Sequence, residues 1–254
     1  MNHGMHHEVT GFLLISKPLA ATSFGCIKIV RRALSRALDK KSRVGHAGTL
    51  DPYATGLLII AIGRVATRRL DELSGLQKEY MATIKLGEQT DSLDIEGTVI
   101  KTCPFEQLTR DDIAAAIASF GSAYHQVPPA HSALKHEGQN LYNLVRKKKM
   151  PLEQVQEIAV KKAKLVQLHA IDLLSFELPI FKIHARVSHG TYIRSLVRDI
   201  AQQAGSCATM VELERSAIGP FRLENAVPIV NIETLEDVKK HLISVDDFFA
   251  RMNS

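Results

Sequence analysis

The segment GHAGTLDPYATGLL, residues 45–58, contains the residue types of a reactive loop. Asp51 and Pro52 lie in its middle, and the proline keeps the preceding aspartate out of helical geometry and so fixes the direction of its carboxylate. Gly45 and Gly48 let a flat ligand approach the backbone closely. By itself an Asp-Pro pair is more often a turn initiator, so the spacing alone leaves both interpretations open.

Other chemistries find less support in the sequence. Cys26, Cys103 and Cys207 are odd in number and widely spaced without a CxxC pair, so the sequence indicates neither a disulfide framework nor a zinc site. A P-loop, a GxGxxG turn and a cluster of metal ligands are all missing from the pattern. We therefore expect no cofactor and no metal.

Composition places the chain among ordinary globular proteins. Its 254 residues are 45% hydrophobic and 23% charged, which suits a packed core and argues against disorder, collagen or a coiled coil. The longest apolar run, Leu57–Ile62, is far shorter than the roughly 20 residues of a membrane span. The opening residues 1–8 are too short and polar for a signal peptide. We expect a cytoplasmic protein with no membrane partner.

The charge of the chain is unevenly distributed. The formal net charge is only +5, yet residues 28–43 contain seven basic residues and one acidic residue. A second basic run occupies residues 146–149, whereas residues 224–254 contain six acidic and three basic residues. Clustered cations suit a polyanion with a phosphate backbone, although charge runs are by themselves more often solvated faces.

The elements that must position these residues follow from hydrophobic periodicity and turn chemistry. The expected strands are 11–16, 57–62, 80–86, 97–101, 163–169 and 181–187, and the expected helices are 22–38, 109–121, 140–148 and 192–204. Strands and helices mix without a regular βαβ rhythm. This favours an α+β fold with a mixed, largely antiparallel central sheet flanked by helices.

Several long segments together resemble one known family. They are GFLLISKP (11–18), GHAGTLDPYATGLL (45–58), KEYMATIKLGEQTDSLDIEG (78–97), QVPPAHSALKHEGQNLYNLVRK (126–147), HGTYIRSLVRDI (189–200) and LERSAIGPF (213–221). In this order they resemble the TruB type of tRNA pseudouridine synthases. The resemblance implies the pseudouridine synthase fold and isomerisation of the uridine at position 55 in the T loop of tRNA, a reaction that needs no redox partner, energy donor or metal.

The resemblance also implies roles for individual residues. The family's nucleophilic aspartate falls on Asp51, its active-site tyrosine on Tyr80 and its active-site arginine on Arg194. Tyr80 is expected to stack on the flipped base, and Arg194 to keep a buried carboxylate ionised. The expected RNA- and base-binding residues are Lys17, Pro18, His46, Thr90, Asp91, Tyr192, Arg146, Lys147 and Lys148.

The resemblance further suggests how the chain is organised. We expect a tail over 1–8, a catalytic domain over 9–222 and a short C-terminal extension over 223–254, a reduced remnant of the PUA-like RNA-binding domain rather than a complete one. The expected partner is the T stem-loop of tRNA. No obligate protein partner is indicated, so we expect a monomer.

Two other functions stay open at this point. The chain could bind and refold tRNA with catalysis secondary or lost. A sugar- or nucleotide-cleaving hydrolase using Asp51 is disfavoured, because no second acidic residue with a suitable context stands out.

Overall fold

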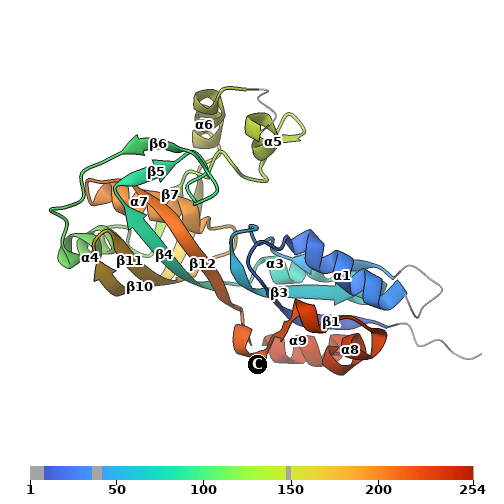
Figure 1. The fold of residues 1–254 in the computed structure, drawn as a ribbon. Coiled ribbons are helices and arrows are strands. Elements are labelled where there is room, and N and C mark those ends of the chain that lie inside the picture. Colours follow the sequence, from blue (N-terminus) through green and yellow to red (C-terminus); the bar gives the residue numbers. More distant parts are fainter. Residues whose placement is uncertain (1–8, 36–41, 147–149, 254) are drawn as a thin grey trace, which may run out of the picture. The chain divides into compact units, whose positions relative to one another are not determined.

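The computed structural model describes residues 9–35, 42–146 and 150–253. The chain divides into two compact units (Figure 1). Unit 1 takes in the chain up to Lys78 and again from Glu214, and unit 2 comprises Glu79–Leu213. Among the residues that the structure describes, no helix is both long and apolar enough to cross a membrane.

Unit 1 is built on a sheet with the strand order β14-β1-β3-β12. Strand β2 pairs with β3, and strand β13 pairs with β12. Its elements are β1 (Gly11–Lys17), α1 (Ser23–Ser35), β2 (Val44–Ala47), β3 (Thr55–Ile62), α2 (Gly63–Arg68), α3 (Leu70–Ser74), the last part of β12 (Ala208–Ile218), β13 (Phe221–Arg222), η1 (Leu223–Asn225), β14 (Val227–Pro228), η2 (Ile229–Asn231), α8 (Leu235–His241) and α9 (Val245–Asn253). Strands β1 and β3 are antiparallel, whereas β14 runs parallel to β1 and β12 runs parallel to β3. The predicted α+β fold with a mixed sheet is confirmed.

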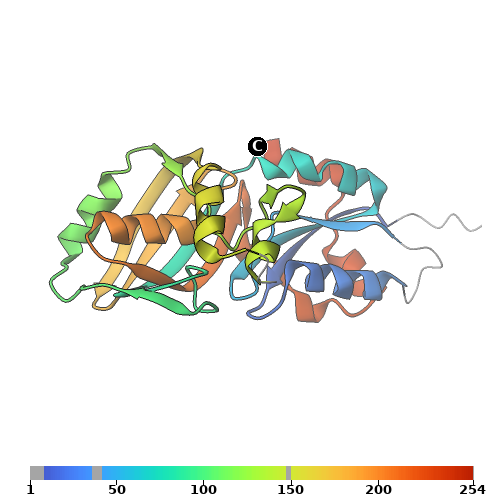
Figure 2. The same cartoon turned by 90° about the horizontal axis from the view of Figure 1, so that it is seen from above.

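The sheet of unit 1 is covered on both faces. Successive side chains of β3 alternate between two apolar clusters: Leu58 and Ile60 pack with α1 and α8, and Leu57 and Ile59 pack with α3 and α9. Helices α1 and α3 accordingly lie on opposite sides of the strands (Figure 2). A strand buried on both faces explains why 57–62 is an uninterrupted apolar run.

The C-terminal segment belongs to this core. Phe248 of α9 stacks on Phe12 of β1 and on Phe221, with ring centroids 4.0 and 4.2 Å apart. Strand β14 pairs with β1, and Val238 of α8 is buried in the cluster that contains α1. The predicted domain boundary after residue 222 therefore falls inside a compact unit.

Unit 2 contains a second set of strands in the order β12-β4-β11-β10-β7. Its elements are β4 (Lys78–Leu86, beginning at the last residue of unit 1), β5 (Glu88–Thr90), β6 (Val99–Thr102), α4 (Arg110–Ala118), β7 (Ala123–Gln126), β8 (Lys135–His136), β9 (Gln139–Asn140), α5 (Leu141–Arg146), α6 (Leu152–Val160), β10 (Lys164–Glu177), β11 (Ile180–Val187) and α7 (Ile193–Gln203). Strand β4 buries every second residue as its alternation predicts. Strand β10 continues to Glu177 instead of ending at 169, because it pairs with β11 along that length. The predicted ends of the helices 22–38 and 140–148 lie outside the described residues.

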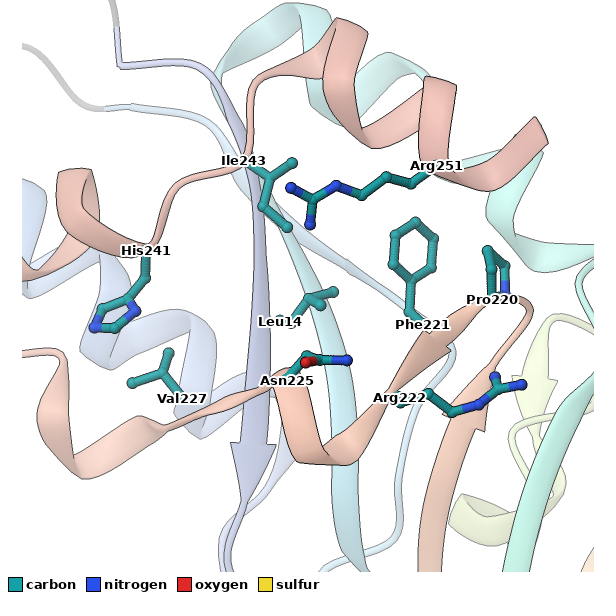
Figure 3. A pocket seen from close by; sticks show the side chains of 9 residues that line it. All are labelled: Leu14, Pro220, Phe221, Arg222, Asn225, Val227, His241, Ile243 and Arg251. Atoms are coloured by element: carbon teal, nitrogen blue, oxygen red, sulfur yellow. The ribbon is translucent and has the colours of Figure 1, made fainter. Parts of the chain in front are cut away.

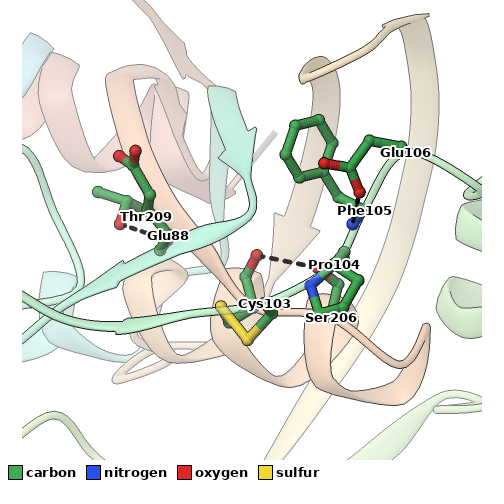
Figure 4. The surroundings of a disulfide bond; sticks show 8 residues. Glu88, Cys103, Pro104, Phe105, Glu106, Ser206 and Thr209 are labelled. Carbon is green, nitrogen blue, oxygen red and sulfur yellow. Dashed lines mark hydrogen bonds between the residues drawn. A yellow bond between two sulfur atoms is a disulfide. The ribbon is translucent and has the colours of Figure 1, made fainter.

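The sequence indicates no disulfide framework, and the structure corrects this expectation for one pair of cysteines. In unit 2, Cys103 and Cys207 are bonded to each other, with their Cα atoms 5.7 Å apart (Figure 4). The two cysteines approach through Gly87, whose N–H donates to the Cys207 carbonyl (2.8 Å) and whose carbonyl accepts from the Cys103 N–H (2.9 Å). Because they are separated by 104 positions, only the packing of the strands brings them together, and Cys26 stays a buried free thiol in unit 1.

Candidate active site

The loop that carries Asp51 is fixed on both sides of the aspartate. The Ser23 hydroxyl accepts a hydrogen bond from the Leu50 N–H (2.9 Å) and donates one to the Leu50 carbonyl (3.0 Å). On the other side, the Pro52 carbonyl accepts from the Ala20 N–H (2.9 Å). Asp51 itself is half-buried. Its backbone is thus held in one place while part of the residue stays accessible.

Lys17 reinforces the same loop from β1. Its side chain is fully buried, and the ammonium group donates to the carbonyls of Ala21 (2.7 Å), Pro18 (3.1 Å) and Pro52 (3.3 Å). These bonds join the turn after β1 to the residue that follows Asp51. Lys17 and Pro18 therefore lie in the framework of the Asp51 loop, with the Pro18 carbonyl as one acceptor.

Arg215 of β12 also binds the segment that carries Asp51, although it is not among the predicted site residues. Its side chain is buried, with Nε donating to the Leu57 carbonyl (2.8 Å) and Nη2 to the Gly48 carbonyl (3.0 Å). Gly56 permits this arrangement, because a Cβ at that position, where φ is +110°, would collide with the Arg215 backbone. Arg215 lies within LERSAIGPF (213–221), one of the segments that resemble the family, and this membership could have marked it as a candidate site residue.

Two further groups lie near the Arg215 guanidinium. Burial, and to a lesser degree the positive charge of Arg215, lowers the pKa of Lys78 to about 8. The Lys78 ammonium donates to the carbonyls of Leu76 (2.7 Å) and Ser74 (3.2 Å). Burial, and then Arg215, also lowers the pKa of His46 on β2, whose Nδ1 has no hydrogen-bond partner among the described residues. His46 is therefore favoured as a neutral ring in this loop region.

In unit 2, Arg194 lies in the first turn of α7 and is almost completely buried. Its Nη1 donates to the Ser92 carbonyl (2.9 Å) and lies 3.2 Å from Oδ2 of Asp94, while Nη2 donates to the His131 carbonyl (3.1 Å). Asp94 is buried too and accepts a hydrogen bond from the Ser92 hydroxyl (2.6 Å). Arg194 is therefore an internal, ion-paired cation rather than an exposed charge on a helix face. Asp94 is not among the predicted site residues.

Thr90 and Asp91 stabilise the loop that supplies these acceptors. The Thr90 hydroxyl donates to the Asp94 carbonyl (2.7 Å), and the Asp91 carboxylate accepts from the Thr98 N–H (2.9 Å). The other Asp91 oxygen lies 3.8 Å from Nε2 of His131. Both predicted residues thus lie in the framework that surrounds Arg194.

The two predicted tyrosines differ in their surroundings. Tyr80 is on the buried side of β4 together with Ala82 and Ile84, as its alternation predicts. Tyr192 is the N-cap residue of α7, and the Gln126 amide accepts from its N–H (2.8 Å) and donates to its carbonyl (3.1 Å). Gln126 thereby fixes the start of the helix that carries Arg194.

The structure sorts the predicted residues into two groups. Lys17, Pro18, His46 and Asp51 lie in unit 1, and Tyr80, Thr90, Asp91, Tyr192 and Arg194 lie in unit 2. Arg146 is the last residue of α5, and Lys147 and Lys148 fall outside the described residues. In the described part of the chain, no group of three or more His, Cys, Asp or Glu side chains could hold a metal ion.

Comparison with known proteins shows the family of the chain. The family model of the N-terminal domain of TruB family pseudouridylate synthases matches residues 35–193. The tRNA pseudouridine synthase B of Parabacteroides distasonis is 44% identical over 213 residues, which cover 84% of this chain and 87% of that protein. The protein of the same name from Opitutus terrae is 38% identical over 240 residues, which cover 94% of each chain.

Solved structures show the same fold. A Cbf5-Nop10-Gar1 complex matches with a TM-score of 0.65 and 25% identity, covering 91% of this chain and 56% of that one. The archaeal box H/ACA sRNP Nop10-Cbf5 complex matches with a TM-score of 0.62 and 24% identity, covering 97% and 58%. This chain spans little more than half the length of these solved chains. On the family match and the identity to its curated relatives, the chain belongs to the TruB family of pseudouridylate synthases.

Proposed function

We propose that this protein isomerises the uridine at position 55 in the T loop of tRNA to pseudouridine, with Asp51 as the nucleophile. The observation that carries the proposal is the fixed backbone around Asp51, which Ser23, Lys17 and Arg215 hold by hydrogen bonds. A nucleophile that is fixed in position before the substrate binds lowers the entropic part of the reaction barrier. Membership of the family supports the same assignment.

The proposed reaction moves the glycosidic bond from N1 to C5 of the same uracil. The glycosidic bond between C1′ and N1 breaks, the uracil turns and a C–C bond forms between C5 and C1′. The C5 proton leaves to solvent and N1 takes up a proton. Atoms and electrons balance without an oxidant, a reductant or water as a reactant. One carboxylate can perform the covalent step, whereas a glycosidase needs a second one to activate water.

Tyr80 and Arg194 act in the same reaction under this proposal. Tyr80 provides an aromatic ring for the extruded base, and Arg194 provides a cation that Asp94 and two backbone carbonyls hold in one orientation. We assign Lys17, Pro18, His46, Thr90, Asp91 and Tyr192 to RNA and base binding. Extruding the base costs a few kcal/mol, which the contacts to the RNA must offset.

The first helix offers a surface for the RNA backbone. Lys28, Arg31 and Arg32 are exposed on α1, and Phe24 is exposed beside them. The Lys28 ammonium lies 5.2 Å from the centre of the Phe24 ring. Cations interleaved with an exposed aromatic ring are typical of nucleic-acid contacts. We assign phosphate contacts to this face and to Arg146, Lys147 and Lys148, with tRNA as the partner of a monomeric, cytoplasmic enzyme.

Tritium release from tRNA labelled with [5-³H]uridine tests the proposal. The wild-type protein should release tritium and modify position 55, and Asp51→Asn should release none while unfolding at the same temperature. Asp71→Asn, an acidic residue of α3 in the same unit, is the matched control and should keep the wild-type rate.

Each outcome of this assay has a defined meaning. No release by the wild-type protein, with tRNA still bound, would favour a tRNA-binding or tRNA-folding protein. Normal release by Asp51→Asn would remove Asp51 as the nucleophile. Release accompanied by modification at another position would overturn the assignment of the T loop.

A further inference from the structure

Polar side chains are arranged differently in the two units. Unit 1 contains a pocket of about 500 Å³, but its Arg222 donates to the Gly219 carbonyl (2.7 Å) and points away from Arg251 (Figure 3). In unit 2, Tyr124, Gln126 and Asp199 are joined by hydrogen bonds beside the first two turns of α7. This network lies next to the helix that carries Arg194, so it bears directly on a residue assigned to the reaction.

Gln126, at the end of β7, is the centre of the network. The residue is only 1% exposed. Its amide oxygen accepts from the Tyr192 N–H (2.8 Å), and its amide nitrogen donates to the Tyr192 carbonyl (3.1 Å) and to the Tyr124 hydroxyl (2.6 Å). A buried amide is tolerated when its donors and its acceptor are all used. These partners therefore hold the Gln126 side chain in one orientation.

The network returns to α7 one turn further along. The Tyr124 hydroxyl donates to Oδ2 of Asp199 (3.0 Å), and Arg198 donates from Nε to Oδ1 of Asp199 (2.8 Å) and from Nη2 to the Val127 carbonyl (3.0 Å). Burial, and then the negative charge of Asp199, raises the pKa of the Tyr124 hydroxyl, so this group stays protonated and can donate. The hydrogen bonds thus run from Gln126 through α7 to Val127, the next residue in the chain.

Helix α7 depends on this support because it has no cap of its own. Its N-cap residue is Tyr192, not one of the usual capping residues Ser, Thr, Asp and Asn. In a capping box, a Glu or Gln at the third helical position binds the N-cap N–H. That position is Ser195 here, and Gln126 makes the bond from β7 instead. A cap from within the helix stabilises it wherever it lies, whereas a cap from β7 also fixes its start relative to that strand.

The residues that follow Gln126 hold the other end of the Arg194 side chain. Pro128 and Pro129 restrict the backbone of this segment. The His131 carbonyl then accepts from Nη2 of Arg194 (3.1 Å). The segment 126–131 therefore fixes the backbone near Arg194 through Gln126 and the guanidinium through His131.

We propose that Gln126 is a positioning residue for the isomerisation, holding the start of α7 so that the Arg194 guanidinium is correctly placed, with Tyr124 and Asp199 orienting Gln126. Gln126 itself makes no contact with the substrate in this scheme, and the part played by Arg194 rests on the proposed function. A misplacement of about 1 Å can slow a reaction about 100-fold. Loss of Gln126 should therefore slow the chemical step while tRNA still binds.

The test uses a substitution that removes only the donors of Gln126. Gln126→Glu keeps the shape of the side chain and an oxygen for the Tyr192 N–H, but an ionised carboxylate cannot donate to the Tyr192 carbonyl or the Tyr124 hydroxyl. Gln107→Glu is the matched control, since it makes the same change at an exposed position of unit 2. Tyr124→Phe removes the next hydrogen bond of the network and leaves both bonds between Gln126 and Tyr192 in place.

Three quantities are measured on the full-length protein. They are the single-turnover rate of tritium release from labelled tRNA, the Kd for tRNA, and hydrogen exchange of the amides in residues 189–200. At pH 8, Gln126→Glu should slow tritium release by about 10- to 100-fold, leave the Kd unchanged and speed exchange at the start of α7. Tyr124→Phe should show a smaller loss of rate, and Gln107→Glu should match the wild type.

The pH dependence separates the missing donors from a general structural defect. A protonated carboxyl group can donate again, so the rate of Gln126→Glu relative to the wild type should rise as the pH falls from about 8 to 6. The other ionisable groups around Gln126 are Tyr124, Asp199, Arg198 and Lys164, which pairs with Gln126 across β7 and β10. Wild type and variant share these groups, so the ratio of their rates reports the introduced carboxyl group.

Other results would overturn the inference. A normal rate in Gln126→Glu, with faster exchange in α7, would make Gln126 a helix cap with no part in the reaction. Equal losses of rate and of tRNA affinity would indicate a contact with the RNA instead. A rate ratio that does not change with pH would remove the lost donors as the cause. If Gln126→Glu unfolds at a lower temperature, Tyr124→Phe decides, and a normal rate in that variant counts against the network.

The proposed function fails in a different way. Absence of tritium release by the wild-type protein would overturn that function together with any role of Gln126 in it, while hydrogen exchange would still report whether Gln126 holds the start of α7. Tritium release by the wild type and by Gln126→Glu at the same rate would overturn the role of Gln126 alone.

Discussion

Arg194 and Asp94 form an ion pair in the interior of unit 2, with 3.2 Å between Nη1 and Oδ2 and only 8% and 4% of their side chains exposed. Two buried charges are tolerated only when each compensates the other and the remaining donors are satisfied. The Ser92 and His131 carbonyls complete that requirement for the guanidinium. Asp94 is thus a positioning residue for Arg194.

Asp94→Asn should therefore lower both the stability of the protein and the rate of tritium release. The substitution leaves a buried guanidinium without its counter-charge, and we expect a loss of about 3–5 kcal/mol in the free energy of unfolding. Single-turnover tritium release should slow as well, because Arg194 loses its fixed orientation. Urea unfolding and rapid-quench kinetics measure the two effects.

Glu88→Gln is the matched control for Asp94→Asn. Glu88 pairs with Lys85 at the surface of the same unit, so its loss should cost less than about 1 kcal/mol and leave the rate unchanged. Equal stability of Asp94→Asn and wild type would show that the ion pair contributes nothing.

Arg215→Lys should loosen the Asp51 loop. An ammonium group cannot reproduce the planar fork that reaches the Leu57 and Gly48 carbonyls, and each lost charged hydrogen bond is worth about 1.5–3 kcal/mol. We expect lower stability and a reduced kcat with little change in the Kd for tRNA. Arg64→Lys, an exposed substitution on α2, should change neither. A raised Kd with normal kcat would indicate an RNA contact instead.

The depressed pKa of Lys78 predicts an unusual dependence of stability on pH. Burial favours the neutral amine in the folded chain, where the pKa is about 8, whereas an unfolded lysine titrates near 10.5. Between these values the unfolded state binds more protons, so the stability contributed by Lys78 rises with pH and is smallest below pH 8. In urea unfolding, wild type should gain stability relative to Lys78→Met as the pH increases from 8 to 10.

Lys85→Met provides the comparison for the pH experiment. Lys85 is a partly exposed lysine of β4. Only a pH slope that is larger for Lys78→Met than for Lys85→Met supports the lowered pKa of Lys78. A flat difference for Lys78→Met would show that Lys78 titrates normally in the folded chain.

Reduction of the Cys103–Cys207 disulfide should destabilise unit 2. The bond closes a long loop in the unfolded chain, and cross-links of this kind contribute about 2–4 kcal/mol. Unfolding in urea with and without dithiothreitol should show this difference in the wild type. In the double variant Cys103→Ser with Cys207→Ser, dithiothreitol should have no effect. A reductant effect that persists in the variant would have another origin.

The sequence predicted the local elements well because their causes are local. Alternation placed Tyr80 on the buried side of β4. The helix predicted from residue 109 corresponds to α4, whose start is stabilised by a capping box of Thr109 and Asp112. The apolar run 57–62 indicated a buried strand. Strand β10 was predicted too short because its last residues are held by pairing with β11 rather than by their own pattern.

By itself, then, the sequence determined the α+β class, the family and the positions of Asp51, Tyr80 and Arg194 along the chain. Which groups compensate each buried charge, and which cysteines pair, follows from the packing of the folded chain. Asp94 lies 100 positions before Arg194, and Arg215 lies 167 positions after Gly48. Such partners are chosen by the packing of strands and helices from distant segments, and periodicity and motif spacing report only on neighbours in the chain.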